Sequence, residues 1–169
     1  MIRSQAVSTA WQKAPRMRLT RQTNYAIRAL VYCAVNAPDL SRIAEIARAH
    51  GISELFLFKL IKPLVEAGLL ETVRGRKGGI RLGRPASEIT LLDTIKLTEE
   101  NFAMAECFEN GTSCFLADNC DLNGVYREAL GSFFDVLDSY TIADLAGKRV
   151  ALRERLGLKV EELVPAARH

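Results

Sequence analysis

The sequence predicts a mainly α-helical fold with a small β-hairpin wing, in which a winged helix-turn-helix domain precedes a long dimerisation helix. Over residues 42–67, two apolar-periodic segments flank a glycine, which is the layout of a helix-turn-helix. Residues 69–82 contain two β-like runs around a glycine-rich turn, which predicts the hairpin. Residues 122–140 carry one apolar stripe at three- and four-residue spacing, which predicts the long helix.

Composition limits the class of protein. The 169 residues are 49% hydrophobic and 25% charged, which excludes disordered and fibrous proteins and suits one domain with an appended element. No apolar run approaches the roughly 20 residues that cross a bilayer, and no apolar stretch near the start has the pattern of a secretory signal. We therefore expect a cytoplasmic protein with no membrane partner.

Charge divides the chain in two. Residues 1–84 hold 15 basic and 5 acidic residues, whereas 85–169 hold 8 and 15, although the net charge is only +3. This asymmetry predicts a polyanion-binding module fused to a part with another task. The alternative is that the charges are divided unevenly by chance. We place four segments along the chain: a flexible N-terminal extension at 1–16, a winged helix-turn-helix DNA-binding domain at 17–84, a cysteine loop with the dimerisation helix at 85–147, and a charged C-terminal tail with a marginal helix at 148–169.

The basic half begins with two predicted helices. Thr20 is expected to cap the first, whose apolar residues keep helical spacing until they end near Pro38. Ser41 is expected to cap a short second helix at 42–50, which Gly51 ends.

A third helix is predicted from Glu54 towards Ala67, with Ser53 as its cap and a kink or a restart at Pro63. The hairpin that follows carries four cations from Arg74 to Arg81, as expected of a wing that reaches along a DNA groove while the third helix enters the major groove. A solvated loop is the alternative. A phosphate-cradling glycine loop is a weaker one, because the Gly-x-x-x-x-Gly-Lys-Ser/Thr spacing is absent.

We expect DNA contacts from residues at the starts of the first and third helices, along the third helix and in the wing. These are Arg18, Arg21, Ser53, Glu54, Phe56, Lys59, Lys62, Arg74, Arg76 and Lys77, of which Phe56 is an equally good core residue.

In the acidic half, Thr90 with Asp93 predicts a capped helix to about Thr98, and Thr141 with Asp144 predicts a further turn or two. The long apolar stripe between them exceeds what a small domain can easily bury beside its winged-helix core. Two-fold pairing with a second copy is therefore expected, and packing onto its own domain is the alternative. The residues expected to dimerise are Leu122, Val125, Tyr126, Leu130, Phe133, Phe134 and Leu137.

The four cysteines fall into two groups. Cys33 lies in the first helical pattern and is expected to be a small buried hydrophobe. Cys107, Cys114 and Cys120 cluster before the long helix, where metal binding or redox chemistry is favoured over disulfides. They lack the close pairs of zinc sites and suit an iron–sulfur cluster better, with zinc, thiol redox and unligated cysteines still open. The sequence contains no catalytic constellation, so neither an enzyme nor a small-molecule substrate is expected.

Four parts of the sequence resemble a known family: Met17-Arg18-Leu19-Thr20, the corner at 46–53, the hairpin at 73–82 and the three-cysteine loop. Together they resemble, over about 17–145, the winged-helix iron–sulfur transcriptional regulators of the IscR, NsrR and RirA type. The segments at 54–59 and 101–109 look closest to the rhizobial iron regulator branch, RirA.

The resemblance implies a homodimeric repressor of iron-uptake genes that binds a DNA operator and carries a 4Fe–4S cluster when iron is plentiful. Cys107, Cys114 and Cys120 match the family's cluster ligands. Asn24 stands where the nitric-oxide-sensing branch has an aspartate, which leaves the fourth ligand open among Glu106, Asp118, Asp121 and solvent. Nitric-oxide or cluster-supply sensing, or a zinc-stabilised interaction module, are the alternative functions.

Overall fold

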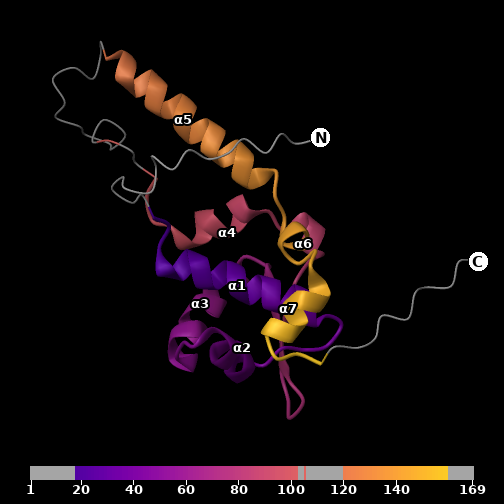
Figure 1. Ribbon diagram of the computed structural model, residues 1–169. Helices are drawn as coiled ribbons and strands as arrows, with labels where there is room; N and C mark the ends of the chain where they lie inside the picture. Colours follow the sequence, from indigo (N-terminus) through magenta and orange to yellow (C-terminus); the bar gives the residue numbers. More distant parts are fainter. Residues whose placement is uncertain (1–17, 103–104, 106–119, 160–169) are drawn as a thin grey trace, which may run out of the picture.

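The fold is a helical domain with one short hairpin and a projecting helix (Figure 1). The computed structural model describes residues 18–102, 105 and 120–159. Its elements are α1 (Arg21–Asn36), α2 (Ile43–His50), α3 (Glu54–Glu66), β1 (Leu70–Val73), β2 (Gly79–Leu82), η2 (Ala86–Glu88), α4 (Leu91–Thr98), α5 (Asp121–Asp138), α6 (Ile142–Leu145) and α7 (Arg149–Arg155). The expected class, mainly helical with a hairpin wing, is confirmed.

Helix α1 lies at the centre, in contact with α3, α4, α6, α7 and β2. Its fully buried residues include Leu30 and Tyr32, which pack in one cluster with Ile46, Leu57 and Ile142 of other helices. Burial of each such side chain stabilises the fold by about 1.5–3 kcal/mol. The core thus gathers residues from both halves of the sequence around α1.

The predicted caps account for most helix starts. The Oγ1 atom of Thr20 accepts a hydrogen bond from the backbone N–H of Thr23 at 3.3 Å, and the Oγ atom of Ser53 accepts one from Phe56 at 3.2 Å. Gly51 adopts the left-handed conformation, with φ of 64°, between α2 and α3. The expected helix-turn-helix corner is confirmed.

One expectation about this region is wrong, and of the kink or restart expected at Pro63 the restart is excluded. Ser41 does not cap α2, because its backbone pairs with Ile80 in an isolated β-bridge. The backbone N–H of Arg42 instead donates to the carboxylate of Glu45 at 3.3 Å. Pro63 does not restart α3, which runs through it as one helix.

The hairpin is antiparallel, with Leu70 opposite Leu82 and Val73 opposite Gly79. The bridge from Ser41 adds a third short extended segment, with N–O distances of 2.9 and 2.8 Å to Ile80. Gly79 is required here, because a Cβ atom on it would lie 2.7 Å from the carbonyl oxygen of Ser41. The wing is therefore fixed to the connection between α1 and α2.

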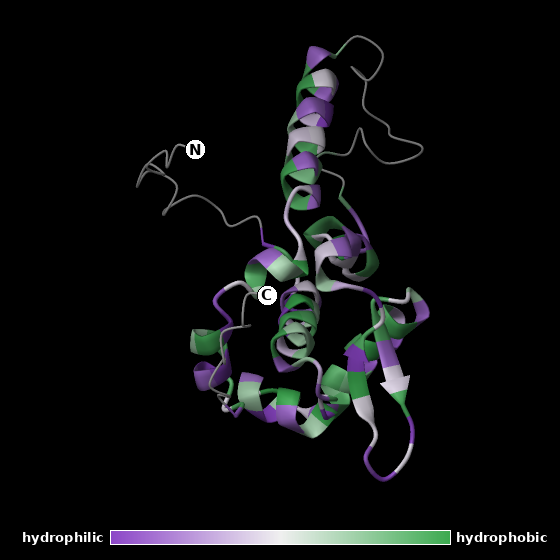
Figure 2. Ribbon diagram, turned by 90° about the vertical axis from the view of Figure 1, so that its right-hand side faces the viewer, coloured by the Kyte–Doolittle hydropathy of each residue, from purple (hydrophilic) through white to green (hydrophobic). Residues whose placement is uncertain are grey.

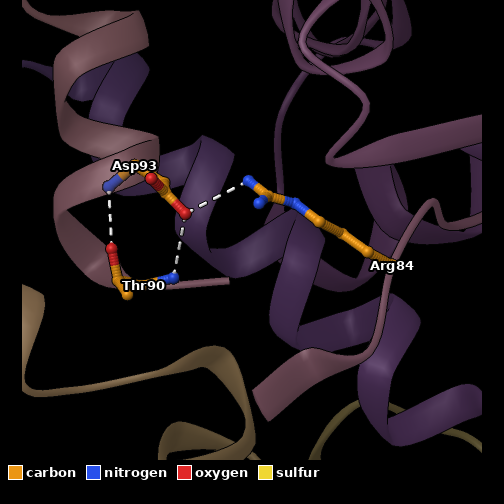
Figure 3. A network of polar contacts seen from close by, with 3 residues as sticks. All are labelled: Arg84, Thr90 and Asp93. Atoms are coloured by element: carbon orange, nitrogen blue, oxygen red, sulfur yellow. Dashed lines mark hydrogen bonds and ion pairs between the residues drawn. The ribbon is translucent and has the colours of Figure 1, made fainter. Parts of the chain in front are cut away.

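An ion pair joins the exit of the wing to α4 (Figure 3). Thr90 and Asp93 form the predicted capping box, in which the Asp93 carboxylate accepts from the Thr90 N–H at 3.3 Å. The same carboxylate accepts from the guanidinium of Arg84 at 3.1 Å. This small polar network sets the direction of the chain as it leaves the wing.

Helix α5 projects from the rest of the protein, and none of its residues is buried (Figure 1). Thr141 then caps α6 through the predicted box with Asp144. None of the helices in the described ranges is long and apolar enough to span a membrane. The N-terminal extension at 1–16 lies outside the described residues.

The segment expected to be a charged tail with a marginal helix, 148–169, contains the short helix α7 in its described part. Helix α7 packs against the end of α1, where the Arg153 guanidinium donates to the carbonyl oxygen of Val35 at 2.8 Å and Arg149 donates to that of Ala37. Arg153 is only 8% exposed. The terminal carbonyls of a helix attract cations, so these arginines dock the segment together with Leu156 and Leu158, which pack against the core.

Candidate nucleic-acid interface

Helix α3 presents one charged face to solvent. Leu57, Leu60 and Leu64 are buried, whereas Glu54 and Lys59 are exposed. Lys62 is also exposed and pairs with Glu66 one turn later, at 3.8 Å. Because both partners of this ion pair are exposed, the pair contributes little stability and can open to a phosphate at small cost.

Two large apolar side chains on α3 also face solvent. Leu55 is 69% and Phe58 is 60% exposed, three residues apart on the helix. Exposed apolar side chains on a helix of this kind can contact the methyl group of thymine in the major groove. Neither residue was expected at the interface, because apolar residues within a helical pattern suggest the core.

Phe56 lies between core and surface. Its half-buried ring meets the ring of Tyr25 edge-on, with centroids 5.8 Å apart. The guanidinium groups of Arg21 and Arg28 lie over the Tyr25 ring, 5.8 and 5.3 Å from its centroid. The ring pair thus joins α3 to a basic face of α1. Arg28 was not expected there, although the spacing 21, 25, 28 already placed the three α1 residues on one helical face.

The turn of the wing is exposed and cationic. Arg74, Arg76 and Lys77 are all exposed, and Figure 2 shows the hydrophilic turn at the end of the hairpin. Arg81 differs, because its guanidinium pairs with Glu71 on the opposite strand at 3.0 Å. The other three cations make no ion pair within the described residues.

The recognition-helix region and the wing lie at the same end of the protein. Both views show α2, α3 and the hairpin turn at the end opposite the free end of α5 (Figures 1 and 2). Arg18 is exposed just before α1. Helices α2 and α3 and the hairpin therefore form one end of the protein and α5 the other.

The cysteines are only partly within the described residues. Cys107 and Cys114 lie outside them. Cys120 is half-exposed at the N-cap of α5 and is a free thiol. Cys33, by contrast, is buried as expected, and burial raises the pKa of its thiol to about 12.

A polar cluster connects the start of α1 to the end of α4, immediately before the cysteine loop. The carboxylate of Glu99 accepts from the Thr20 N–H at 2.6 Å and also from the Thr23 hydroxyl. The hydroxyl groups of Thr23 and Thr98 are 2.7 Å apart and both side chains are buried. Nothing in the sequence pattern indicated this contact, which joins residues more than seventy positions apart.

The predicted dimerisation residues form a partly uncovered stripe on α5. Leu122 is 50% and Val125 is 58% exposed, whereas Tyr126, Leu130, Phe133, Phe134 and Leu137 are half-buried. Phe134 meets the ring of Phe102 edge-on, with centroids 5.0 Å apart. Among the described residues, the main contact of α5 with its own domain is with α4.

Comparison with known proteins identifies the family. The Rrf2 family model, described as an iron-dependent transcriptional regulator, matches residues 19–148. The chain belongs to the Rrf2 family. It is therefore a DNA-binding transcriptional regulator with a winged helix, not an enzyme, and the recognition of this regulator type from the sequence is confirmed.

Members of the Rrf2 family with several names are similar to this chain. Protein aau3 of Rhizobium meliloti is 62% identical over 144 residues, which cover 85% of this chain and 94% of that protein. The transcriptional regulator NsrR of Geobacillus kaustophilus is 42% identical, covering 83% and 97%. The structure of CymR, the global cysteine regulator of Bacillus subtilis, has a TM-score of 0.62 and 28% identity, covering 79% and 98%.

Proposed function

We propose that this Rrf2 regulator is an iron-responsive repressor that binds its operator as a homodimer and holds a 4Fe–4S cluster. The main support is the polar cluster at Glu99, because it connects the segment entering the cysteine loop to the start of the DNA-binding half. Iron as the signal is part of this proposal, because similar regulators have different names, such as NsrR and CymR.

For DNA, α3 enters the major groove and the wing follows the backbone. Ser53, Glu54, Phe56 and Lys59 lie nearest the bases, together with the exposed Leu55 and Phe58. Lys62, Arg18 and Arg21 contact phosphates, and the wing cations Arg74, Arg76 and Lys77 do the same beyond them. Their exposure and the lack of ion pairs among the described wing cations support this assignment.

Two copies pair through the stripe on α5. The exposed Leu122 and Val125 at its far end have no cover from the described part of their own domain. Two-fold pairing of these helices would remove apolar surface from water and would set the spacing of two recognition helices on two half-sites.

Cys107, Cys114 and Cys120 hold the cluster. Cys120 suits this role, because it is half-exposed at the N terminus of α5, where backbone N–H groups favour an anionic ligand. When bound, the cluster supplies iron-dependent cross-linking of the three cysteines. Glu99, which precedes the cysteine loop, holds the backbone of Thr20, so a constraint on that loop would bear on the start of α1.

The test is anaerobic purification, with iron and sulfide assays, absorption spectra, and operator binding with and without iron. Cys114→Ala is expected to abolish both the visible cluster absorption and the iron dependence of operator affinity, and Cys33→Ala serves as the buried control. Retention of both properties in Cys114→Ala would exclude the ligand assignment. Nitric oxide is the second candidate signal, because the sequence resembles a family that includes a nitric-oxide-sensing branch. Loss of operator binding on nitric oxide treatment, with no response to iron, would select it.

A further inference from the structure

A polar groove of about 480 Å³ lies beside α2, at the opposite end of α1 from the Glu99 cluster. Its walls come from the end of α1, from α2, and from α7 with the residues that follow it (Figure 1). Gly157 adopts the left-handed conformation, with φ of 68°, and so turns the chain back from α7. Leu158 and Lys159 are thereby brought to the groove wall. A volume of this size suits a small organic molecule.

Three buried side chains with polar groups line this groove: Asn36, whose amide already donates to Leu40 and Ser41, and the pair Tyr32 and Arg153. Tyr32 is 2% and Arg153 is 8% exposed. The Arg153 guanidinium donates through Nη1 to the carbonyl oxygen of Val35 and through Nε to that of Lys159, at 2.8 and 2.6 Å. Within the described residues it has no carboxylate partner. A buried guanidinium that bonds only to uncharged carbonyl oxygens keeps its positive charge uncompensated. Such a group favours an anion beside it.

Glu45, Arg48 and Arg153 line the groove together with Tyr32. Burial raises the pKa of Tyr32, and the carboxylate of Glu45 raises it further. Arg153 and Arg48 oppose this shift and lower the pKa. Lys159 lines the groove as well, and Asp39 lies exposed at its rim. The lining therefore combines three cations with two acids and one phenol.

We propose that this groove binds a small dicarboxylate that also carries a hydrogen-bond-donating hydroxyl or ammonium group. One carboxylate would lie between Arg48 and Arg153, the second would face Lys159, and the donor group would face Glu45 or Asp39. Bidentate guanidinium–carboxylate contacts are strong and directional, which suits recognition of this class. Because α2 is the first helix of the helix-turn-helix, an occupied groove would add a second input to DNA binding.

Isothermal titration of the full chain without DNA tests the site, with malate, aspartate and succinate as probes of equal carbon number. Malate or aspartate should bind at least tenfold more tightly than succinate, which lacks the donor group. Tyr32→Phe and Arg48→Gln should each weaken that binding at least tenfold, about 1.4 kcal/mol. Arg155→Gln, an exposed α7 change outside the groove, should leave it unaltered.

Three outcomes would overturn the proposal: no probe binds, succinate binds as well as malate and aspartate, or the two groove variants bind like the wild type. Binding that is lost on replacing Arg76 and Lys77 with Ala would place the anion on the wing instead. Circular dichroism of Tyr32→Phe and Arg48→Gln separates lost binding from lost folding. No operator DNA or cluster enters the titration, so its failure leaves the proposed repressor function standing.

Discussion

Removal of two wing cations should reduce the salt dependence of operator binding and leave the fold unchanged. Arg76 and Lys77 are exposed in the turn between β1 and β2 and make no ion pair within the described residues. Their replacement with Ala therefore deletes charge without removing a buried contact. If both neutralise phosphates, the double variant should bind more weakly at low salt and lose less affinity as salt rises.

The size of the effect follows from counterion release. Each neutralised phosphate contributes about 0.9 to the slope of log affinity against log salt concentration, so two contribute about 1.8 per half-site. Between 50 and 200 mM salt, the wild type should lose about twelvefold more affinity per half-site than the double variant. Fluorescence anisotropy with a labelled operator over this range measures both slopes.

Arg81→Ala is the matched control for this experiment. Its guanidinium is on the same hairpin but pairs with Glu71 at 3.0 Å, so its charge is already compensated. A smaller change in slope is expected for this variant than for either Arg76 or Lys77. An unchanged slope in the double variant, or an equal change in Arg81→Ala, would remove the wing turn from the phosphate interface.

Two further variants and one labelling experiment test other parts of the protein. Glu99→Ala removes two hydrogen bonds at the start of α1; operator titrations with and without iron should show a smaller iron effect while the cluster spectrum persists, and an undiminished iron effect would exclude this connection. Val125→Asp puts a charge on the exposed stripe of α5. Light scattering should show a monomer and circular dichroism an unchanged helix content. A stable dimer would place the interface elsewhere. Cys33, whose thiol has a pKa of about 12 in its buried site, should resist iodoacetamide at pH 8 until the chain unfolds; mass spectrometry detects its alkylation, and rapid labelling of the folded protein would contradict its burial.

Local signals predicted the helices and the wing well, because their causes lie within a few residues. The caps at Thr20, Ser53 and Thr90 each bond to an N–H three positions along, so the sequence contains both partners of each interaction. Ser41 was misassigned for the opposite reason. Its backbone is satisfied by Ile80, thirty-nine positions away, and no local pattern indicates such a partner.

Two polar residues that the sequence did not reveal, Glu99 and Arg153, act across long separations. Arg153 reads as a solvated cation in a charged tail, yet it is buried because the end of α1 offers it carbonyl oxygens. Leu55 and Phe58 show the converse, since an apolar pattern on α3 includes positions that the fold leaves exposed. Hydropathy assigns each residue an average environment, whereas a functional surface is made of residues that depart from it.

The long-range contacts of Glu99 also bear on regulation. Its carboxylate holds the backbone of Thr20 and the hydroxyl of Thr23, so a change in the segment that follows α4 must alter the N-cap of α1 or break these bonds. A hydrogen bond to a charged group contributes about 1.5–3 kcal/mol, which corresponds to roughly ten- to a hundredfold in an equilibrium. That range is sufficient for a switch between strong and weak operator binding. The proposed switch therefore needs no large domain movement, because Glu99, just after α4, bonds directly to the start of α1.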